Sequence, residues 1–186
     1  MLLARMIAPI HSLGPGRRLG IWFQGCSKRC KECISPEMQI FDKSKEVPVD
    51  MMVMLIKQEA ERNNCHRLTI SGGDPFEQPH ELYKLLRGVR HFFKDILVYT
   101  GFTLDEIIKK KNLSRCLKYI DVLVDGRYIA EENRGVSRLY GSCNQKIHFF
   151  NNVLATEYKE YEEQNGMLES FIHKEKVIIV GIQRRD

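Results

Sequence analysis

Strand-like and helix-like segments alternate along the first two thirds of the chain, and this alternation constrains the fold more than any other feature. A helical pattern over 47–64, with Pro48 at its start, precedes a strand and glycine turn over 66–75. The same order then recurs as a helix over 76–93, a strand over 95–101, helical segments over 103–111 and 113–120, and a strand over 120–126. Strands joined by helices form parallel sheets with right-handed crossovers. The sequence therefore predicts an α/β fold with parallel strands.

Both ends of the chain add elements to this core. We expect a first strand near residues 2–9 and a second over 19–23, after a glycine-rich turn. Beyond residue 126 we expect an irregular stretch over 127–150, a polar helix over 155–166, and two strands, over 167–174 and 176–182, that form a closing hairpin. An eight-fold barrel takes about 250 residues. The 186 residues therefore predict one domain, 1–186, with a partial barrel or an open sheet.

Composition excludes several classes of protein. The net charge of +5 is spread over separate short segments without aromatic interleaving, so we expect a solvated basic surface and no nucleic-acid partner. No stretch reaches the roughly 20 apolar residues of a membrane span, and the amino terminus lacks the apolar region of a secretion signal. These features predict a cytoplasmic protein without a membrane partner.

Three of the six cysteines, Cys26, Cys30 and Cys33, lie within eight positions at the carboxyl end of the second expected strand. In a reducing compartment such cysteines are free thiols or metal ligands. A CxxxCxxC loop can hold three corners of a 4Fe-4S cluster, which leaves the fourth iron open to a small molecule. The alternatives are unbound thiols or a zinc site, for which Cys65 and His66 are the nearest further ligands. We assign no site to Cys65, Cys116 and Cys143, which are scattered.

The loop "QGCSKRCKEC" resembles the signature of the radical S-adenosylmethionine enzymes. The resemblance implies that Cys26, Cys30 and Cys33 hold a 4Fe-4S cluster, whose open iron chelates the amino and carboxylate groups of S-adenosylmethionine. It also implies reductive cleavage of that cofactor to a 5′-deoxyadenosyl radical, which removes a hydrogen atom from a substrate. The fold implied is a partial (β/α) barrel of the radical S-adenosylmethionine type.

Glycine-rich and polar motifs follow the later strands. Gly72 and Gly73 let the backbone approach a ligand, and Asp74 can accept a hydrogen bond from an ammonium group; alternatively the segment is a turn whose aspartate caps the next helix. "SGGDP" resembles the glycine-rich motif that holds the methionine amino group in this superfamily, with aspartate in place of glutamate. Thr100 ends the next strand, where cofactor contact and a simple turn are equally open.

Asp125 and Arg127 follow the last strand of the alternation, and an arginine can pair with a carboxylate; a turn with a solvated arginine is the alternative. They resemble an Asp-x-Lys/Arg element of the glycyl-radical activases, which implies cofactor contact. "GSCNQKI", which contains Asn144, resembles a segment of the anaerobic (class III) ribonucleotide reductase activating proteins. Five motifs occur in the order of that family over residues 13–147. Glu32 departs from the pattern, because this position is often aromatic in the superfamily, where it can pack against adenine, and glycine in the activase branch, where it lets the loop turn.

The resemblance implies an activase that takes a hydrogen atom from a glycine of an anaerobic ribonucleotide reductase. It further implies a flavodoxin or ferredoxin as reductant and an anaerobic cytoplasm. A second hypothesis is a stand-alone radical S-adenosylmethionine enzyme that acts on a nucleotide, peptide or other small substrate. A third is a non-catalytic iron–sulfur or zinc module, which leaves the glycine and Asp-Gly-Arg motifs unexplained.

Overall fold

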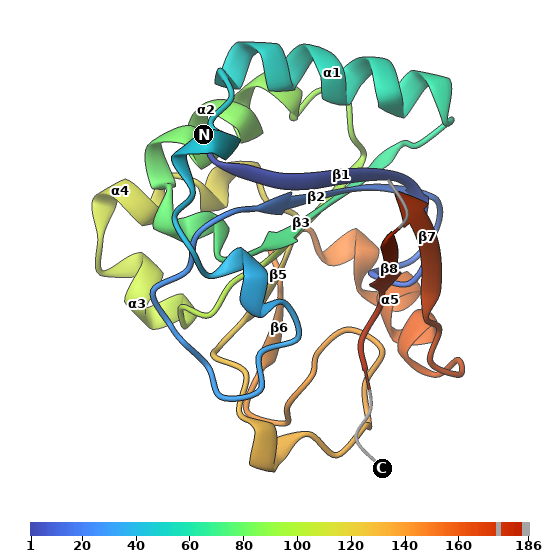
Figure 1. Ribbon diagram of the computed structural model, residues 1–186. Helices are drawn as coiled ribbons and strands as arrows, with labels where there is room; N and C mark the ends of the chain where they lie inside the picture. Colours follow the sequence, from blue (N-terminus) through green and yellow to red (C-terminus); the bar gives the residue numbers. More distant parts are fainter. Residues whose placement is uncertain (174–175, 184–186) are drawn as a thin grey trace.

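The computed structural model describes residues 1–173 and 176–183 and is built on a six-stranded sheet (Figure 1). The strands lie in sequence order: β1 (Leu3–Ile10), β2 (Arg18–Phe23), β3 (Arg67–Gly72), β4 (Asp95–Tyr99), β5 (Val122–Asp125) and β6 (Lys146–Phe149). The four central strands are parallel, and β1 and β6 pair antiparallel at the two edges. The predicted α/β fold with parallel strands is confirmed, and the described sheet is open at β1 and β6.

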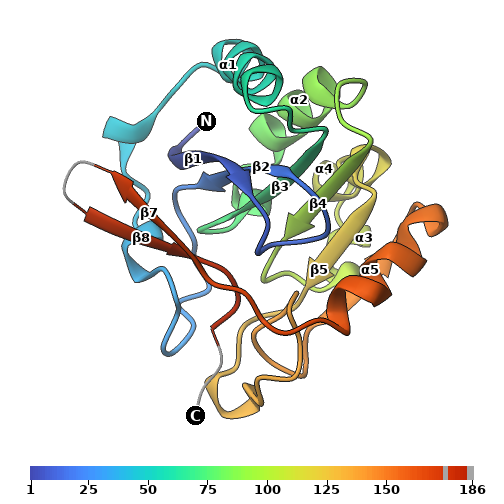
Figure 2. The ribbon, with the colours of Figure 1, turned by 90° about the vertical axis from the view of Figure 1, so that its right-hand side faces the viewer.

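Helices and a separate hairpin cover the two faces of the sheet (Figure 2). Side chains of four helices pack against one face: α1 (Val49–Arg62), α2 (Pro79–Val89), α3 (Leu104–Ile108) and α4 (Lys111–Ser114). The other face packs against α5 (Ala155–Glu162) and against a hairpin of β7 (Glu169–His173) and β8 (Lys176–Val180). The expected closing hairpin is confirmed; residue 174, which ends the first predicted strand, and the linking residue 175 lie outside the described residues.

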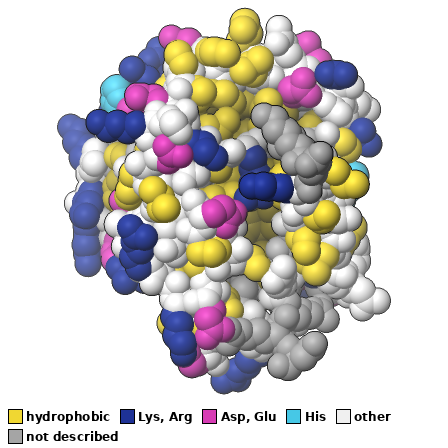
Figure 3. Space-filling view, viewed as in Figure 1, with side chains coloured by type: hydrophobic (Ala, Val, Ile, Leu, Met, Phe, Trp, Pro, Cys, Tyr) yellow, Lys and Arg dark blue, Asp and Glu magenta, His cyan; other side chains and the backbone are white. Residues whose placement is uncertain are grey.

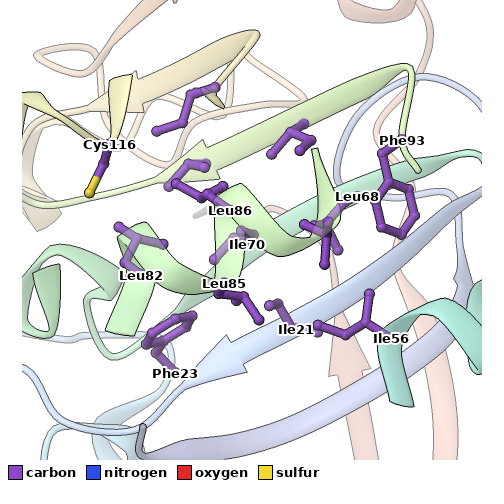
Figure 4. Close-up of a cluster of buried hydrophobic side chains, with 14 of the residues drawn as sticks. Ile21, Phe23, Ile56, Leu68, Ile70, Leu82, Leu85, Leu86, Phe93 and Cys116 are labelled. Atoms are coloured by element: carbon purple, nitrogen blue, oxygen red, sulfur yellow. The ribbon is translucent and has the colours of Figure 1, made fainter. Parts of the chain in front are cut away.

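The largest hydrophobic cluster lies between the sheet and helices α1 to α4 (Figure 4). Alternate residues of β2, such as Ile21 and Phe23, point into it and are fully buried, as are Leu68 and Ile70 of β3. Each such side chain contributes about 1.5–3 kcal/mol by leaving water. This packing fixes the strand ends on which the functional residues lie.

Several predicted boundaries were wrong. The helix expected over 76–93 is shorter, because residues Pro75–Glu77 form a 3-10 turn and α2 begins at Pro79. The strand β6 lies in the stretch expected to be irregular; it has only four residues, and its pairing with β5 supplies the backbone hydrogen bonds that define it. None of the helices in the described part of the chain has the length and hydropathy needed to cross a bilayer.

A buried ionic network joins the amino ends of the central strands, opposite the cysteine loop. The Arg18 guanidinium, at the start of β2, donates to Asp95 of β4 at 2.5 Å and to Thr69 of β3 at 2.6 Å. The hydroxyl of Tyr158 on α5 donates to the same Asp95 carboxylate at 3.0 Å. Because buried charges cost several kcal/mol unless they are paired and hydrogen-bonded, this network holds α5 and three strands in register.

Candidate active site

The carboxyl ends of β3, β4 and β5 surround a cavity of about 550 Å³. The surface is hollowed near the centre of the view in Figure 3, on the same side as the cysteine loop in Figure 1. Its lining includes Cys26, Cys30, Cys33, Gly72, Gly73, Asp74 and Thr100. The sequence motifs separated by up to 74 positions therefore line one cavity at the sheet edge where α/β folds place their ligands.

The cysteine loop leaves β2 and is closed at its base by backbone hydrogen bonds. Gly25 N–H donates to the carbonyl oxygen of Met38 at 2.7 Å, and Cys26 N–H donates to that of Gln39 at 3.1 Å. Cys26 is buried, whereas Cys30 and Cys33 are partly exposed. Between these anchors the loop turns through left-handed backbone, with φ +55° at Glu32. Glycine adopts that conformation without cost, which gives a physical reason for glycine at this position in the family that the loop resembles.

The arrangement of the thiols fits a cluster better than a single ion. Among the described residues, no three histidine, cysteine, aspartate or glutamate side chains gather closely enough to hold one metal ion. A 4Fe-4S cluster has no such requirement, because each thiolate binds a different iron at a separate corner. Cys65, the further ligand considered for zinc, is instead buried in the large hydrophobic cluster. Three thiols around one cavity are thus a suitable donor set for a cluster with one open iron.

The surroundings of two of the thiols, Cys26 and Cys30, disfavour thiolates without a metal. Burial raises the pKa of Cys26 to about 11, and burial also raises the pKa of Cys30. The backbone N–H of Tyr128 and the charge of Arg127 lower the pKa of Cys30 in part. A coordinating metal deprotonates a thiol outright, so iron binding would produce the thiolates that burial alone disfavours.

The two glycines at the end of β3 pack directly on the cysteine loop. Gly73 N–H donates to the carbonyl oxygen of Phe23 at 2.8 Å, and Asp74 N–H donates to that of Gly25 at 2.9 Å. A Cβ on Gly73 would lie 2.4 Å from the Gly25 oxygen, and one on Gly72 would lie 2.3 Å from the Phe23 backbone. Gly72 also has φ +118°. Both positions therefore require glycine for the approach of two backbone segments, in addition to any approach of a ligand.

Asp74 joins the ends of β3 and β4. Its Oδ1 accepts from Thr100 Oγ1 at 2.8 Å and from Phe76 N–H at 3.0 Å, and its Oδ2 accepts from Gly101 N–H at 2.9 Å. Burial raises the pKa of this carboxyl to about 6, against these hydrogen bonds and the nearby charge of Lys28, which lower it. The capping alternative is thus correct, because Asp74 caps the following 3-10 turn, and Asp74 also lines the cavity. Thr100 lies on the same edge as Asp74 and donates to it, and its contact with a cofactor stays a prediction.

The other three predicted site residues are placed differently. The Asp125 carboxylate accepts from Leu104 N–H at 2.5 Å and lies 3.0 Å from His148 Nε2, so it is turned toward α3 and β6. Asn144 Nδ2 donates to the carbonyl oxygen of Arg127 at 2.8 Å. Asp125, Arg127 and Asn144 do not line the cavity. They hold together the segments that bring Gly126, Tyr128 and Gln145 to its wall.

Sequence reasoning missed residues that fasten the cysteine loop. The Glu77 carboxylate accepts a short hydrogen bond from Ser27 Oγ and another from Ser27 N–H at 3.3 Å. Lys28, one residue further on, lies 3.8 Å from the same carboxylate and lines the cavity. Glu77 belongs to the "SGGDPFEQ" motif, so the motif contained the signal. Nothing in the sequence distinguishes Lys28 from the neighbouring exposed Lys31.

The chain is similar to proteins with a known type of cluster. Residues 12–148 match the family described as "4Fe-4S single cluster domain". The anaerobic ribonucleoside-triphosphate reductase-activating protein of Haemophilus influenzae is 35% identical over 144 residues, which cover 74% of this chain and 90% of that protein. The chain belongs to this family of activating proteins. The proteins of the same name from Vibrio cholerae and Enterobacteria phage T4 are 34% and 30% identical, over 74% and 72% of this chain and 90% and 85% of their own lengths.

The family match covers the cysteine loop, the glycine turn and the wall segments of the cavity, but ends at residue 148. Helix α5 and the hairpin lie beyond it. Gly181, Ile182 and Gln183, which follow the hairpin, nevertheless line the cavity, and Asn133 Nδ2 donates to the Gln183 carbonyl oxygen at 3.2 Å. The segment outside the family match therefore contributes to the cavity wall of this activating protein.

Proposed function

We propose that the protein generates a glycyl radical in an anaerobic ribonucleotide reductase, with a 4Fe-4S cluster and S-adenosylmethionine as cofactors. The observation that carries this proposal is the single cavity lined by the three cysteines, the Gly-Gly-Asp turn and the end of β4. Membership of the activating-protein family supports the choice of partner. When bound, the reduced cluster supplies the electron that cleaves S-adenosylmethionine, and the resulting 5′-deoxyadenosyl radical removes the glycine hydrogen atom.

The residues of the cavity have different roles in this reaction. Cys26, Cys30 and Cys33 hold three irons and leave the fourth open. The carbonyl groups of the glycine turn and the carboxylate of Asp74 receive the methionine ammonium, because Asp74 is buried where an opposite charge is strongly favoured. Thr100 and Gly101 orient that carboxylate by donating to its two oxygens. Asp125, Arg127 and Asn144 act on the cofactor through the wall segments they hold together.

The open sheet suits a macromolecular substrate. We regard it as a partial barrel of the radical S-adenosylmethionine type, and a glycine-bearing loop of the partner would reach the cavity beside the partly exposed Cys30 and Cys33. Cys30 and Cys33 are partly exposed, which leaves a short path for an electron from a flavodoxin or ferredoxin. The oxygen sensitivity of such clusters implies an anaerobic cytoplasm as the place of action.

One observation favours a second candidate, a stand-alone enzyme acting on a small substrate. Residues 181–183 line the cavity and lie outside the family match, so part of the cavity wall comes from a segment that the match does not cover. Among enzymes that share one type of reaction, the segments around the site commonly determine which substrate is accepted.

The test is an anaerobic cleavage assay. We expect the reconstituted protein with a chemical reductant to convert S-adenosylmethionine to methionine and 5′-deoxyadenosine, and a ribonucleotide reductase to be activated in the same mixture. Cys30→Ala provides the matched control, in which both products should disappear. Cleavage that persists without any iron–sulfur absorption would contradict the proposal.

A further inference from the structure

The carboxylate of Glu77 joins the turn after β3 to the first residues of the cysteine loop. One oxygen, Oε1, accepts from both the hydroxyl and the backbone N–H of Ser27, and the Lys28 ammonium lies 3.8 Å from the same oxygen. The Glu77 side chain is only 17% exposed, yet Glu77 does not line the cavity. It therefore acts on the site through the loop, and not by touching a molecule bound in the cavity.

The segment that Glu77 holds is the one that follows Cys26 directly. Burial is the main cause of the raised pKa of the Cys26 thiol, the backbone N–H of Lys28 lowers that pKa, and the charges of Asp74 and Glu77 raise it further. The Glu77 carboxylate is therefore close enough to the Cys26 sulfur to act on its charge. It also fixes Ser27, and with it the position of the N–H group that faces this sulfur.

Two pairs of opposite charges contact the loop, and they differ in their exposure to water. The Lys28 side chain is 6% exposed, its ammonium lies 3.0 Å from the centroid of the Phe102 ring, and its distance from Glu77 exceeds the 2.7–2.9 Å or so of a charge-assisted hydrogen bond. Lys31 and Glu131 form the second pair at 2.9 Å, and their side chains are 73% and 66% exposed. Water and salt screen the exposed pair, whereas the fields of Lys28 and Glu77 extend into the protein.

The charges and hydrogen bonds around an iron–sulfur cluster set its reduction potential. A nearby negative charge opposes the entry of an electron, and a nearby positive charge favours it. We propose that Glu77 lowers the reduction potential of the cluster held by the three cysteines and that Lys28 limits this effect. The inference rests on the function proposed above and concerns its electron-transfer step, in which an external reductant gives one electron to the cluster and no bond breaks. A lower potential makes the reduced cluster a stronger reductant for S-adenosylmethionine.

A redox titration of the reconstituted full chain, without S-adenosylmethionine, tests this assignment apart from turnover. Glu77→Gln keeps an acceptor oxygen for Ser27 but removes the charge. At the wild-type midpoint potential, its ratio of reduced to oxidised cluster should rise about 10-fold, the factor for one charge roughly 10 Å away at an effective dielectric constant of about 20. Lys28→Gln should change the ratio in the opposite direction. The control Glu131→Gln, which removes an exposed charge from the same loop, should stay within about 2-fold, and all variants should keep the wild-type iron and sulfide content.

The opposite signs separate an electrostatic role from a merely structural one. Shifts of Glu77→Gln and Lys28→Gln in the same direction, or a Glu77→Gln shift no larger than that of Glu131→Gln, would overturn the assignment. A Glu77→Gln protein that takes up less iron and sulfide would also overturn it, because Glu77 would then only support the loop. In each of these cases the proposed function stands if the wild type cleaves S-adenosylmethionine. If the wild type forms the cluster and shows the predicted shifts but cleaves no S-adenosylmethionine, the proposed function fails and the assignment of Glu77 holds.

Discussion

The substitution Asp74→Asn tests how much the buried charge of Asp74 lowers the free energy of unfolding and how much the same charge contributes to cofactor binding. The side chain of Asp74 is buried, and burial raises the pKa of its carboxyl from 3.8 to about 6. The three donors to this carboxylate, Thr100, Phe76 and Gly101, offset the burial only in part. Asparagine has nearly the same shape and can still accept at one oxygen, but it does not ionise.

The sign and size of the effect follow from proton linkage. Between about pH 4 and 6 the folded protein holds a proton on Asp74 that the unfolded chain releases, so this group stabilises the fold below that window and loses its contribution as the pH rises through 6. Each pH unit between the two pKa values is worth about 1.4 kcal/mol. The free energy of unfolding of the wild type, minus that of Asp74→Asn, should therefore fall by about 2.4 kcal/mol between pH 4 and pH 7.

The assay is urea unfolding of the two cluster-free, reduced proteins at several pH values. Taking the difference between them cancels the other titrating groups, which both proteins share. A difference that stays flat, or rises with pH, would refute the reasoning, because it would mean that hydrogen bonds fully repay the burial of the charge. In the cluster-loaded protein, the same variant should bind S-adenosylmethionine at least about 10-fold more weakly at pH 8, where Asp74 is ionised.

Three substitutions, two of them paired with a control substitution, test the loop. Gly73→Ala should lower the free energy of unfolding in urea by about 2–3 kcal/mol and lower the iron content, because its Cβ meets backbone atoms. The control Gly126→Ala should lower the free energy of unfolding by about 1 kcal/mol and keep the iron. Equal effects of the two substitutions would contradict the packing argument. Cys30→Ala should abolish the cluster absorption, and exposed Cys143→Ala should preserve it. Glu32→Gly should raise the free energy of unfolding by about 1 kcal/mol by relieving left-handed backbone, and no gain would show that other contacts hold that turn.

The sequence predicted the central parallel strands and the gathering of motifs at their carboxyl ends, because hydrophobic period and strand order determine both. It could not predict β6, whose four residues depend on pairing with β5. It also gave no signal for the Arg18 and Asp95 pair, since residues 77 positions apart meet only once the strands are in register.

In the candidate site, too, the sequence identified some residues and missed others. Gly72, Gly73 and Asp74 stood out because their types and spacing carry a physical requirement. Lys28 did not stand out, because burial distinguishes it from the exposed Lys31, and burial depends on where Phe102 and Glu77 lie in the folded chain. The roles assigned to Asp125, Arg127 and Asn144 as cofactor contacts stay predictions, which cofactor-binding measurements on variants with substitutions at these three positions can decide.

The measurement that most directly tests the central claim is electron paramagnetic resonance of the partner. The cluster-loaded protein is mixed anaerobically with S-adenosylmethionine, a reductant and an anaerobic ribonucleotide reductase whose glycine carries deuterium at the α carbon, beside an unlabelled sample. We predict a doublet in the unlabelled sample that needs every component and is absent with Cys30→Ala, and the transfer of deuterium into 5′-deoxyadenosine in the labelled one. Accumulation of 5′-deoxyadenosine with neither signal nor deuterium would contradict the account and show that the radical acts on another substrate.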